Sequence, residues 1–196
     1  MSQDKLRKTI RQQRRSLTPE ERWQKSEMLA RRIAKSHAFH TSHRIACYLA
    51  MDGEIDLTPT IEIAWAMGKE ICVPVLNSHT NNKLWFAKFD ENDKLVPNKY
   101  GILEPVMTKR KRVNTHSIDF VLTPLVAFDD QGNRLGMGGG YYDRSFAFLR
   151  HRQQWRKPRL MGVAYDFQRV DPLATQSWDV PLHSIATESS LVQFSK

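Results

Sequence analysis

Four short apolar runs constrain the fold of this 196-residue chain more than any other feature of its sequence. The runs are RIACYLA at 44–50, EICVPVL at 70–76, IDFVLTPLVAF at 118–128 and RLMGVAY at 159–165. Strands lose the alternation of polar and apolar residues when both faces of their sheet are covered, which is typical of parallel sheets. We therefore predict buried strands in a mostly parallel sheet, with 118–128, the most apolar run, as the central strand.

Helical patterns precede and separate these runs, as the crossover connections of a parallel sheet require. Thr18, Pro19 and Glu21 occupy the N-cap, N1 and N3 positions of a capping box, which marks the start of a helix. The expected helices cover 4–15, 19–36, 58–67 and 142–150. Strands alternating with helices predict an α/β fold with helices on both faces of the sheet.

The middle of the chain has a weaker pattern. Residues 83–89 alternate polar and apolar side chains, which predicts a half-exposed strand after a polar turn at 77–82. A long loop is expected next, because Pro97, Gly101 and Pro105 interrupt any regular element. A short strand near Ile185 is expected to end the pattern.

Length and composition fit a globular protein, with 40% hydrophobic and 26% charged residues. We therefore expect one domain over 1–196, and a monomer. No apolar stretch approaches the roughly 20 residues of a membrane span, so we expect a cytoplasmic location. The net charge of +9 favours anionic partners. Much of the basic excess lies at 5–15 and at 109–112, and a solvated loop is the simpler interpretation of the second run.

The segment NRLGMGGGYYD at 133–143 carries the clearest chemical signal. It follows the most buried run and contains four glycines in five positions, which expose backbone N–H groups that can cradle phosphate oxygens. The segment is neither a Walker A loop nor a dinucleotide-binding fingerprint. Arg134 can pair with phosphate and Asp143 can hold magnesium, so both favour a phosphate site over a flexible turn.

This segment and its surroundings resemble the 5-formyltetrahydrofolate cyclo-ligase family. The hallmark loop reads RLGMGGGYYD at 134–143 and follows PLVAFD at 124–129. Further landmarks occur in the family's order: Leu6-Arg7 in a basic first helix, MDGEI at 51–55, YGILEP at 100–105 and WDVP at 178–181. The resemblance covers nearly the whole chain, and implies the three-layer α/β/α fold shared with sugar-phosphate isomerases and CoA transferases.

The resemblance also implies an activity, the ATP- and Mg²⁺-dependent closure of 5-formyltetrahydrofolate to 5,10-methenyltetrahydrofolate. In that family the formyl oxygen attacks the γ-phosphate of ATP, and N10 then attacks the resulting iminophosphate before phosphate leaves. Such phosphoryl transfer depends on positioning and charge neutralisation rather than on a nucleophilic side chain.

Carried over residue by residue, the family pattern assigns most of the site to the glycine loop. The implied ATP-binding residues are Lys5, Arg7, Arg134, Leu135, Gly136, Met137, Gly138, Gly139, Gly140, Tyr141 and Tyr142, with Arg134 and Tyr142 as catalytic residues. The implied folate-binding residues are Leu49, Met51, Glu54, Tyr100 and Tyr142, and the implied Mg²⁺ ligands are Asp143 and Asp179. The folate is expected to be polyglutamylated.

Several of these residues also have a simpler interpretation. Asp179 is typical of a turn or an N-cap, Glu54 of a hairpin corner, and the aromatic residues and Met51 of core packing. The sequence also departs from the family at Gln3, which stands where a lysine is usual; Lys5 or Lys8 could supply the missing charge.

Two other functions compete with the cyclo-ligase. A nucleic-acid-binding module would use the basic segments 4–15 and 109–112, but Glu54, Asp143 and Asp179 would repel its phosphates. We therefore expect no nucleic-acid or membrane partner. A sugar-phosphate isomerase or CoA transferase would keep the fold, and the transferase would need Glu54 or Glu104 as its nucleophile.

Overall fold

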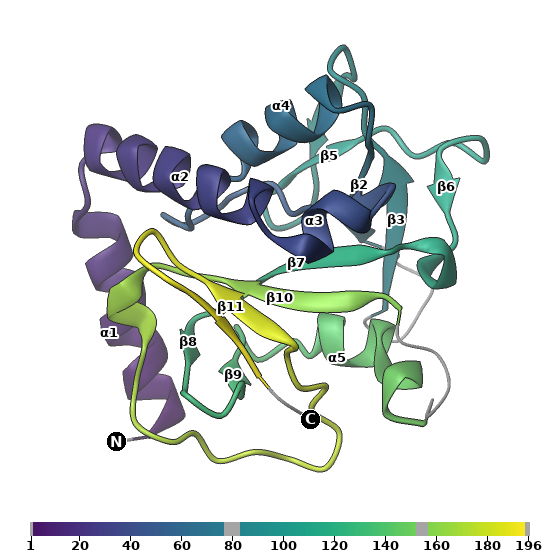
Figure 1. Cartoon of the computed structure of the whole chain (residues 1–196). Helices are drawn as coiled ribbons and strands as arrows, with labels where there is room; N and C mark the ends of the chain where they lie inside the picture. Colours follow the sequence, from purple (N-terminus) through teal and green to yellow (C-terminus); the bar gives the residue numbers. More distant parts are fainter. Residues whose placement is uncertain (1, 77–82, 152–156, 195–196) are drawn as a thin grey trace.

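A computed structural model describes residues 2–76, 83–151 and 157–194, so the predicted turn at 77–82 lies outside the described residues. Over these ranges the main sheet has eight strands in the order β12-β11-β10-β7-β1-β2-β3-β6 (Figure 1). Their bounds are β1 Arg44–Ala46, β2 Glu70–Leu76, β3 Leu84–Lys88, β6 Arg112–Val113, β7 Phe120–Pro124, β10 Arg159–Val163, β11 Ser184–Ala186 and β12 Leu191–Gln193.

The centre of the sheet is parallel. Strand β7 pairs in parallel with β10 over its whole length, from Phe120 opposite Arg159 to Pro124 opposite Val163. β1 is parallel to both β7 and β2, and β10 is parallel to β11. The antiparallel strands β12, β3 and β6 lie toward the two edges. The predicted mostly parallel sheet is thus confirmed.

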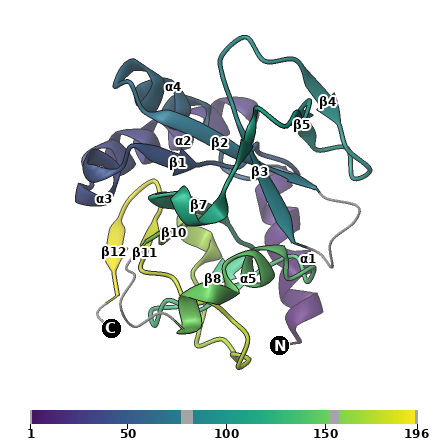
Figure 2. The same cartoon turned by 90° about the vertical axis from the view of Figure 1, so that its right-hand side faces the viewer.

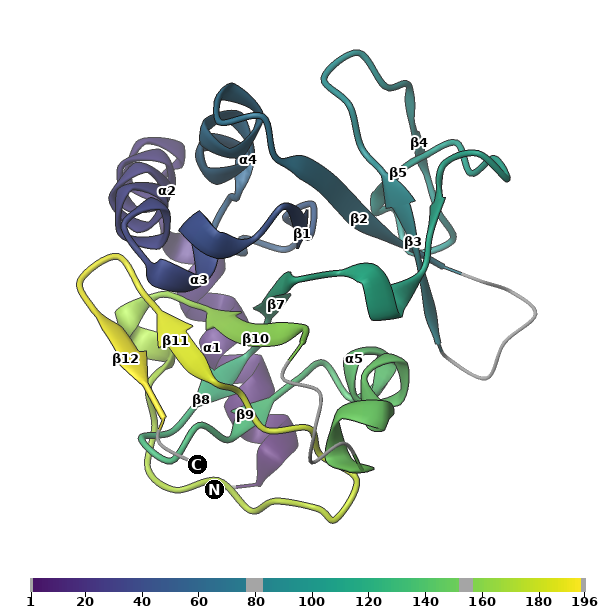
Figure 3. The same cartoon turned by 45° about the vertical axis from the view of Figure 1, so that its right-hand side comes forward.

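Both faces of the sheet are covered. Along β7, Phe120 and Leu122 pack into one apolar cluster and Val121 into another on the opposite face. Helices α2 (Pro19–Ala34), α3 (His37–Thr41) and α4 (Thr58–Ala66) cover one face, and α5 (Tyr141–Ser145) with the hairpin of β8 (Ala127–Phe128) and β9 (Arg134–Leu135) covers the other (Figures 1 and 3). Helix α1 (Gln3–Ser16) contacts β8. These layers confirm the α/β/α class.

Local signals explain how the N-terminal helices begin and end. The N–H of Glu21 donates to Thr18 Oγ1 at 3.2 Å, and the N–H of Thr18 donates to Glu21 Oε2 at 2.7 Å, as a capping box requires. Helix α2 ends at Ala34, short of the predicted 36, because Ser36 caps α3 by accepting a hydrogen bond from the N–H of Phe39.

The predicted strand at 118–128 is wrong in one respect, since it is two strands. β7 ends at Pro124, and β8 pairs with β9 outside the main sheet. Between them the carbonyl oxygens of Leu125 and Val126 accept hydrogen bonds from Gln168 Nε2 at 2.9 and 2.8 Å. A side chain thus occupies acceptors that a continuous strand would give to its neighbour.

The predicted helix at 142–150 is not one continuous α-helix. It consists of α5 and a 3₁₀ helix at Ala147–His151; further 3₁₀ turns lie at Thr115–Ser117 and Asp166–Gln168. Ser145 ends α5: its Oγ donates to the carbonyl of Tyr141 at 2.7 Å and accepts from the N–H of Leu84 at 2.8 Å. Residue 145 therefore ties the helix to the start of β3.

The region predicted as a long loop contains a hairpin, β4 (Leu95–Pro97) and β5 (Leu103–Pro105). This hairpin lies outside the main sheet, on the side where β2 and β3 are found (Figure 2). Strand β3 is more buried than the half-exposed strand we predicted, because β2 and β6 flank it and Phe86 and Ala87 are fully buried. None of the described helices is long and apolar enough to cross a bilayer.

Candidate active site

A cavity of about 520 Å³ lies where the parallel strands end. Tyr48 and Leu49 line it just after β1, Leu76 at the end of β2, and Pro124 at the end of β7. The carboxyl ends of strands are where α/β folds bind their ligands. The glycine loop and the β4–β5 hairpin supply further walls.

The cavity brings together most of the predicted site residues. Those that line it are Leu49, Met51, Glu54, Tyr100, Arg134, Gly136, Met137, Gly139, Gly140, Tyr141, Tyr142 and Asp143. The described lining does not include Lys5, Arg7, Leu135, Gly138 or Asp179. Segments far apart in the chain thus converge on one site.

Arg134 is held rigidly beside the glycine loop. Its side chain is 8% exposed, and its guanidinium donates to Asp143 Oδ1 and to the carbonyl oxygen of Val180. Asp143 Oδ1 also accepts a hydrogen bond from the N–H of Val180 at 3.1 Å. The planar guanidinium is therefore oriented before any ligand arrives.

The glycines are required by the loop's backbone. Gly138 and Gly140 have φ of 94° and 61°, in the region that side-chain-bearing residues disfavour. At Gly139 an added Cβ would lie 2.8 Å from the ring of Tyr141. The short helix α5 that follows contributes less dipole than the longer predicted helix, so exposed backbone N–H groups remain the main feature of the loop.

Helix α1 brings Arg7, but not Lys5, to the glycine loop. The Nε–H of Arg7 donates to the carbonyl oxygen of Gly136 at 3.0 Å. Its Nη2 donates to the side chain of Gln3 at 3.3 Å, and its Nη1 pairs with Asp4 at 2.7 Å. Lys5 is exposed on the helix surface. The unusual Gln3 thus contacts Arg7.

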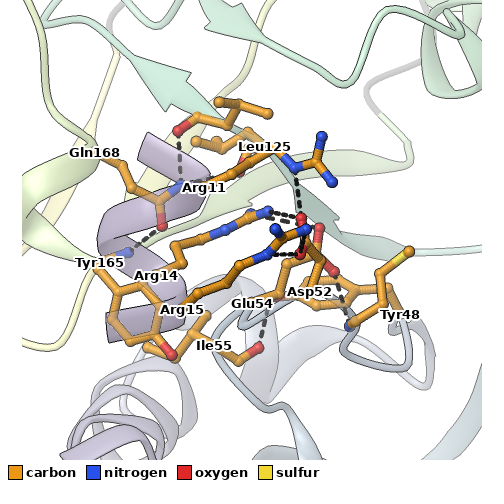
Figure 4. A network of polar contacts seen from close by, with 12 residues as sticks. Arg11, Arg14, Arg15, Tyr48, Asp52, Glu54, Ile55, Leu125, Tyr165 and Gln168 are labelled. Carbon is orange, nitrogen blue, oxygen red and sulfur yellow. Dashed lines mark hydrogen bonds and ion pairs between the residues drawn. The ribbon is translucent and has the colours of Figure 1, made fainter. Parts of the chain in front are cut away.

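Glu54 is a carboxylate in the lining of the same cavity, with 11% of its side chain exposed. Its Oε2 accepts a hydrogen bond from the N–H of Met51 at 3.2 Å, and its Oε1 lies 3.6 Å from Nη1 of Arg14 (Figure 4). Burial raises the pKa of Glu54 to about 7, although Arg14 and the Met51 N–H act in the opposite direction. The Glu54 carboxylate is thus a hydrogen-bond acceptor whose charge depends on its burial and on Arg14 beside it.

Tyrosines form the aromatic part of the cavity. Burial raises the pKa of Tyr142 far above its ordinary value, so its phenol stays protonated and can donate a hydrogen bond. The ring of Tyr142 stacks on Phe146, with centroids 6.2 Å apart. The hydroxyl groups of Tyr100 and Tyr141 are 3.3 Å apart, so the β4–β5 hairpin contacts the glycine loop across the cavity.

Asp143 and Asp179 have different surroundings. Asp179 caps a turn: its Oδ2 accepts from the N–H of Gln176 at 2.8 Å, which fits the turn interpretation. Asp143 lines the cavity, and both hydrogen bonds it accepts from described residues use Oδ1. Among the described residues no group of three or more His, Cys, Asp or Glu side chains could hold a metal ion. A metal ion at Asp143 would therefore need further oxygens from a molecule bound in the cavity.

From the sequence, Glu104 was named only as a possible transferase nucleophile, and Tyr48 was not named at all. Glu104, buried on β5, accepts hydrogen bonds at Oε1 from the N–H of Leu76 and Nδ2 of Asn98, at 2.9 and 2.6 Å. This carboxylate fastens the hairpin to the end of β2. Tyr48 donates to the carbonyl of Ile55 at 2.8 Å and supports the turn that carries Glu54. The strand-end rule could have identified Tyr48; Glu104 depends on a hairpin that was not predicted.

The parallel sheet, the cavity at its carboxyl edge and the glycine loop beside a fixed arginine define an α/β enzyme. A model of the 5-formyltetrahydrofolate cyclo-ligase family matches residues 1–188, and the chain belongs to that family. The resemblance inferred from the glycine loop and its landmarks is confirmed.

Individual relatives agree. The chain is 38% identical to 5-formyltetrahydrofolate cyclo-ligase of Escherichia coli (strain K12) over 184 residues, 93% of this chain and 98% of the relative. It is 35% identical to that of Haemophilus influenzae, covering 92% and 94%. An NMR structure of Aquifex aeolicus 5,10-methenyltetrahydrofolate synthetase superposes with a TM-score of 0.82 at 33% identity, covering 100% of this chain and 94% of that one.

Family membership supports the enzyme rather than the nucleic-acid-binding module. The basic segments also contact the chain's own residues. Arg11 and Arg15 pair with Asp52, each at 2.5 Å. In the second segment Lys111 pairs with Asp93, and Arg112 lies 4.2 Å from the ring centroid of Trp85. Much of the basic charge is thus engaged within the fold.

Proposed function

We propose that this chain catalyses the ATP- and Mg²⁺-dependent cyclisation of 5-formyltetrahydrofolate to 5,10-methenyltetrahydrofolate, with release of ADP and phosphate. The observation that carries the proposal is one cavity lined both by the glycine loop with Arg134 and by the largely buried Glu54. Such a cavity has a wall suited to phosphates and a wall suited to a flat heterocycle. Family membership supports the same reaction.

The triphosphate binds on the glycine-loop side. Its oxygens accept hydrogen bonds from backbone N–H groups at 136–142 and from Arg134, with Arg7 contributing from α1. Leu135 and Gly138 support the loop without lining the cavity. Lys5 is exposed, and we assign it at most a long-range attraction for the nucleotide.

The folate binds on the other side. Glu54 accepts paired N–H bonds from the pterin edge, and Leu49, Met51, Tyr100 and Tyr142 enclose the rings. A carboxylate that accepts two N–H bonds in a mostly apolar cavity discriminates strongly, because a ligand lacking those donors would remove its water without replacing those hydrogen bonds.

The reaction proceeds by two displacements. The formyl oxygen attacks the γ-phosphorus of ATP, the bond from phosphorus to the β–γ bridging oxygen breaks, and ADP leaves. N10 then attacks the activated formyl carbon and loses its proton, and the carbon–oxygen bond breaks to release phosphate. Arg134 neutralises charge that develops on the transferred group, and the protonated Tyr142 donates a hydrogen bond to it. This gives Arg134 and Tyr142 their proposed catalytic roles.

Asp143 is the protein group best suited to hold Mg²⁺. It lines the cavity, and one of its oxygens is not used by Arg134 or Val180. A magnesium ion takes one or two carboxylates together with phosphate oxygens and water, so a single protein carboxylate is compatible with the ion. When bound, the ion would neutralise triphosphate charge. Asp179 lies one residue from Val180, and its participation is a weaker proposal.

The proposal has further parts that the substrates suggest. We also propose a monomer with a single catalytic domain over 1–196. ATP and folates are present in the cytoplasm, so a cytoplasmic location is part of the proposal. The net charge of +9 suits a polyglutamylated folate.

Methenyl absorbance tests the proposal. Purified protein with 5-formyltetrahydrofolate should produce the methenyl chromophore only when ATP and a divalent metal are both present, with one ADP per product. Turnover of equal rate without ATP would overturn it. Transfer of CoA, or isomerisation of a sugar phosphate, would instead support the alternative reactions on this fold.

A further inference from the structure

Arg14 is a charged side chain buried in the core. It lies on α1 with a side-chain exposure of 1%, facing the turn at 51–54 together with Arg11 and Arg15 (Figure 4). Arginine is almost never buried so completely unless its charge is compensated. The residue therefore has a specific electrostatic partner.

The partners of Arg14 are two carboxylates on the same turn. Its Nη2 donates to Asp52 Oδ2 at 3.4 Å, and its Nη1 lies 3.6 Å from Glu54 Oε1. Within the described part of the chain, Nε and Nη1 of Arg14 make no hydrogen bond. Asp52 already binds Arg11 and Arg15 at 2.5 Å each, so its charge is compensated without Arg14. Glu54 has no other cationic partner of this kind among its described contacts.

The turn and the helix are fixed to each other by their backbones. Asp52 and Gly53 adopt φ of 51° and 72°, and an added Cβ at Gly53 would lie 2.9 Å from the carbonyl oxygen of Arg14. The N–H of Glu54 donates to the carbonyl of Met51 at 2.9 Å and closes the turn. This close approach keeps the guanidinium of Arg14 beside the Glu54 carboxylate.

We infer that Arg14 is a positioning residue for Glu54: its buried guanidinium orients the carboxylate toward the cavity and favours its charged form, which accepts hydrogen bonds from the folate. Arg14 does not line the cavity, so it acts through Glu54 rather than on the ligand. The inference rests on the proposed function and gives helix α1 an indirect role in folate binding.

The charges around Glu54 support this role. Burial raises its pKa, Arg14 and the Met51 N–H lower it, and Asp52 raises it. The other groups that face this site are the phenols of Tyr48 and Tyr142, and Arg11 and Arg15 beyond Asp52. Without Arg14 the remaining influences would favour the protonated form, so Glu54 would lose its charge at a higher pH.

The test compares Arg14→Gln with Arg15→Gln. Arg15 lies on the same helix and also pairs with Asp52, but its side chain is 61% exposed. For Arg14→Gln we expect KM for 5-formyltetrahydrofolate to rise on the order of tenfold at neutral pH, the loss expected for a weakened charge-assisted contact. The fall of kcat/KM toward acid should begin at a higher pH than in the wild type. KM for ATP should stay within about twofold.

Arg15→Gln should leave the pH profile for folate unchanged. A profile of Arg14→Gln that coincides with the wild type, or an equal shift in Arg15→Gln, would overturn the inference.

If Arg14→Gln does not fold, Arg14→Lys provides the test. One ammonium cannot contact both Asp52 and Glu54 as a guanidinium does, so KM for folate should rise several-fold with little change in the pH profile. An unchanged KM in Arg14→Lys would also overturn the inference.

Calorimetric titration with 5-formyltetrahydrofolate alone separates this inference from the proposed function. A wild-type chain that neither binds nor cyclises the folate contradicts the proposed function. A wild-type chain that does both, with Arg14→Gln binding equally well across the pH range, contradicts the role of Arg14 only.

Discussion

The Nε–H of Arg7 donates a hydrogen bond to the carbonyl oxygen of Gly136 at 3.0 Å, across 129 residues of sequence. This contact joins the N-terminal helix to the glycine loop, and Gly138 lies beside the same guanidinium, since its Cβ would be 3.9 Å from Arg7 Nη2. Helix α1 therefore connects two parts of the cavity lining: Arg7 contacts the glycine loop, and Arg14 contacts the turn of Glu54.

The first prediction concerns ATP affinity. Arg7→Gln should raise KM for ATP about tenfold, because it removes a charge and a hydrogen bond at the edge of the glycine loop. Lys5→Gln is the matched control, since Lys5 is exposed and exposed charges contribute little. Initial rates at varied ATP measure both. Equal losses in the two variants would indicate a diffuse electrostatic effect and contradict a specific role for Arg7.

The second prediction distinguishes the two aspartates. Asp143→Asn should raise the magnesium concentration for half-maximal activity on the order of tenfold or more, because it removes a hard anionic ligand from the cavity wall. Asp179→Asn should have a smaller effect, since its carboxylate caps a turn. Magnesium titrations at fixed ATP give both values. A larger effect at Asp179 would identify it as the main ligand.

The third prediction concerns the hairpin that carries Tyr100. Tyr100→Ala should raise KM for folate about five- to tenfold, through loss of a ring that encloses the pterin. Tyr100→Phe keeps the ring and loses only the contact with the Tyr141 hydroxyl, so it should stay within about twofold. Steady-state kinetics with both variants measure this. If Tyr100→Phe loses as much as Tyr100→Ala, the hydroxyl contact matters rather than the ring.

The fourth prediction concerns stability and pH. Burial raises the pKa of Glu54 from 4.5 to about 7, so between these values the native chain keeps a proton that the unfolded chain has lost. The contribution of Glu54 to stability is therefore present at low pH and is lost as the pH rises through this window.

Glu54→Gln removes that dependence. Its free energy of unfolding, relative to the wild type, should shift in favour of the variant by on the order of 2 kcal/mol between about pH 5 and pH 8. Denaturant unfolding of the ligand-free proteins at both pH values measures the shift. Parallel pH curves for the two proteins would show that Glu54 titrates normally.

Local sequence signals predicted the parts of the fold that local physics determines. The capping box at Thr18 and the apolar run of β2 lie where we expected them, because each depends on neighbouring residues. The break after Pro124 was not predicted, because it depends on Gln168, 42 and 43 residues from the carbonyls it binds. Contacts at such separations leave no periodicity in the sequence.

The residues of the candidate site can be divided in the same way, into those that a local motif predicts and those that depend on distant contacts. The glycine loop forms a dense local motif. The family resemblance identified Glu54 and Tyr100 as candidate site residues, and both line the cavity. Arg14 has no motif of its own, since it is a single arginine within a basic helix. Glu104 lies in the landmark YGILEP, but that motif does not reveal that its carboxylate fastens a hairpin to β2. Their roles become visible only when the turn at 51–54 and the hairpin are placed in space.

The measurement that tests the central claim most directly follows the formyl oxygen. We claim that this oxygen takes the γ-phosphoryl group of ATP within the cavity and leaves as phosphate. With ¹⁸O in the formyl group of 5-formyltetrahydrofolate, mass spectrometry should find one labelled oxygen in the inorganic phosphate for each methenyl product. Unlabelled phosphate accompanied by labelled water would contradict the claim, because cyclisation would then proceed without phosphorylation of the formyl oxygen.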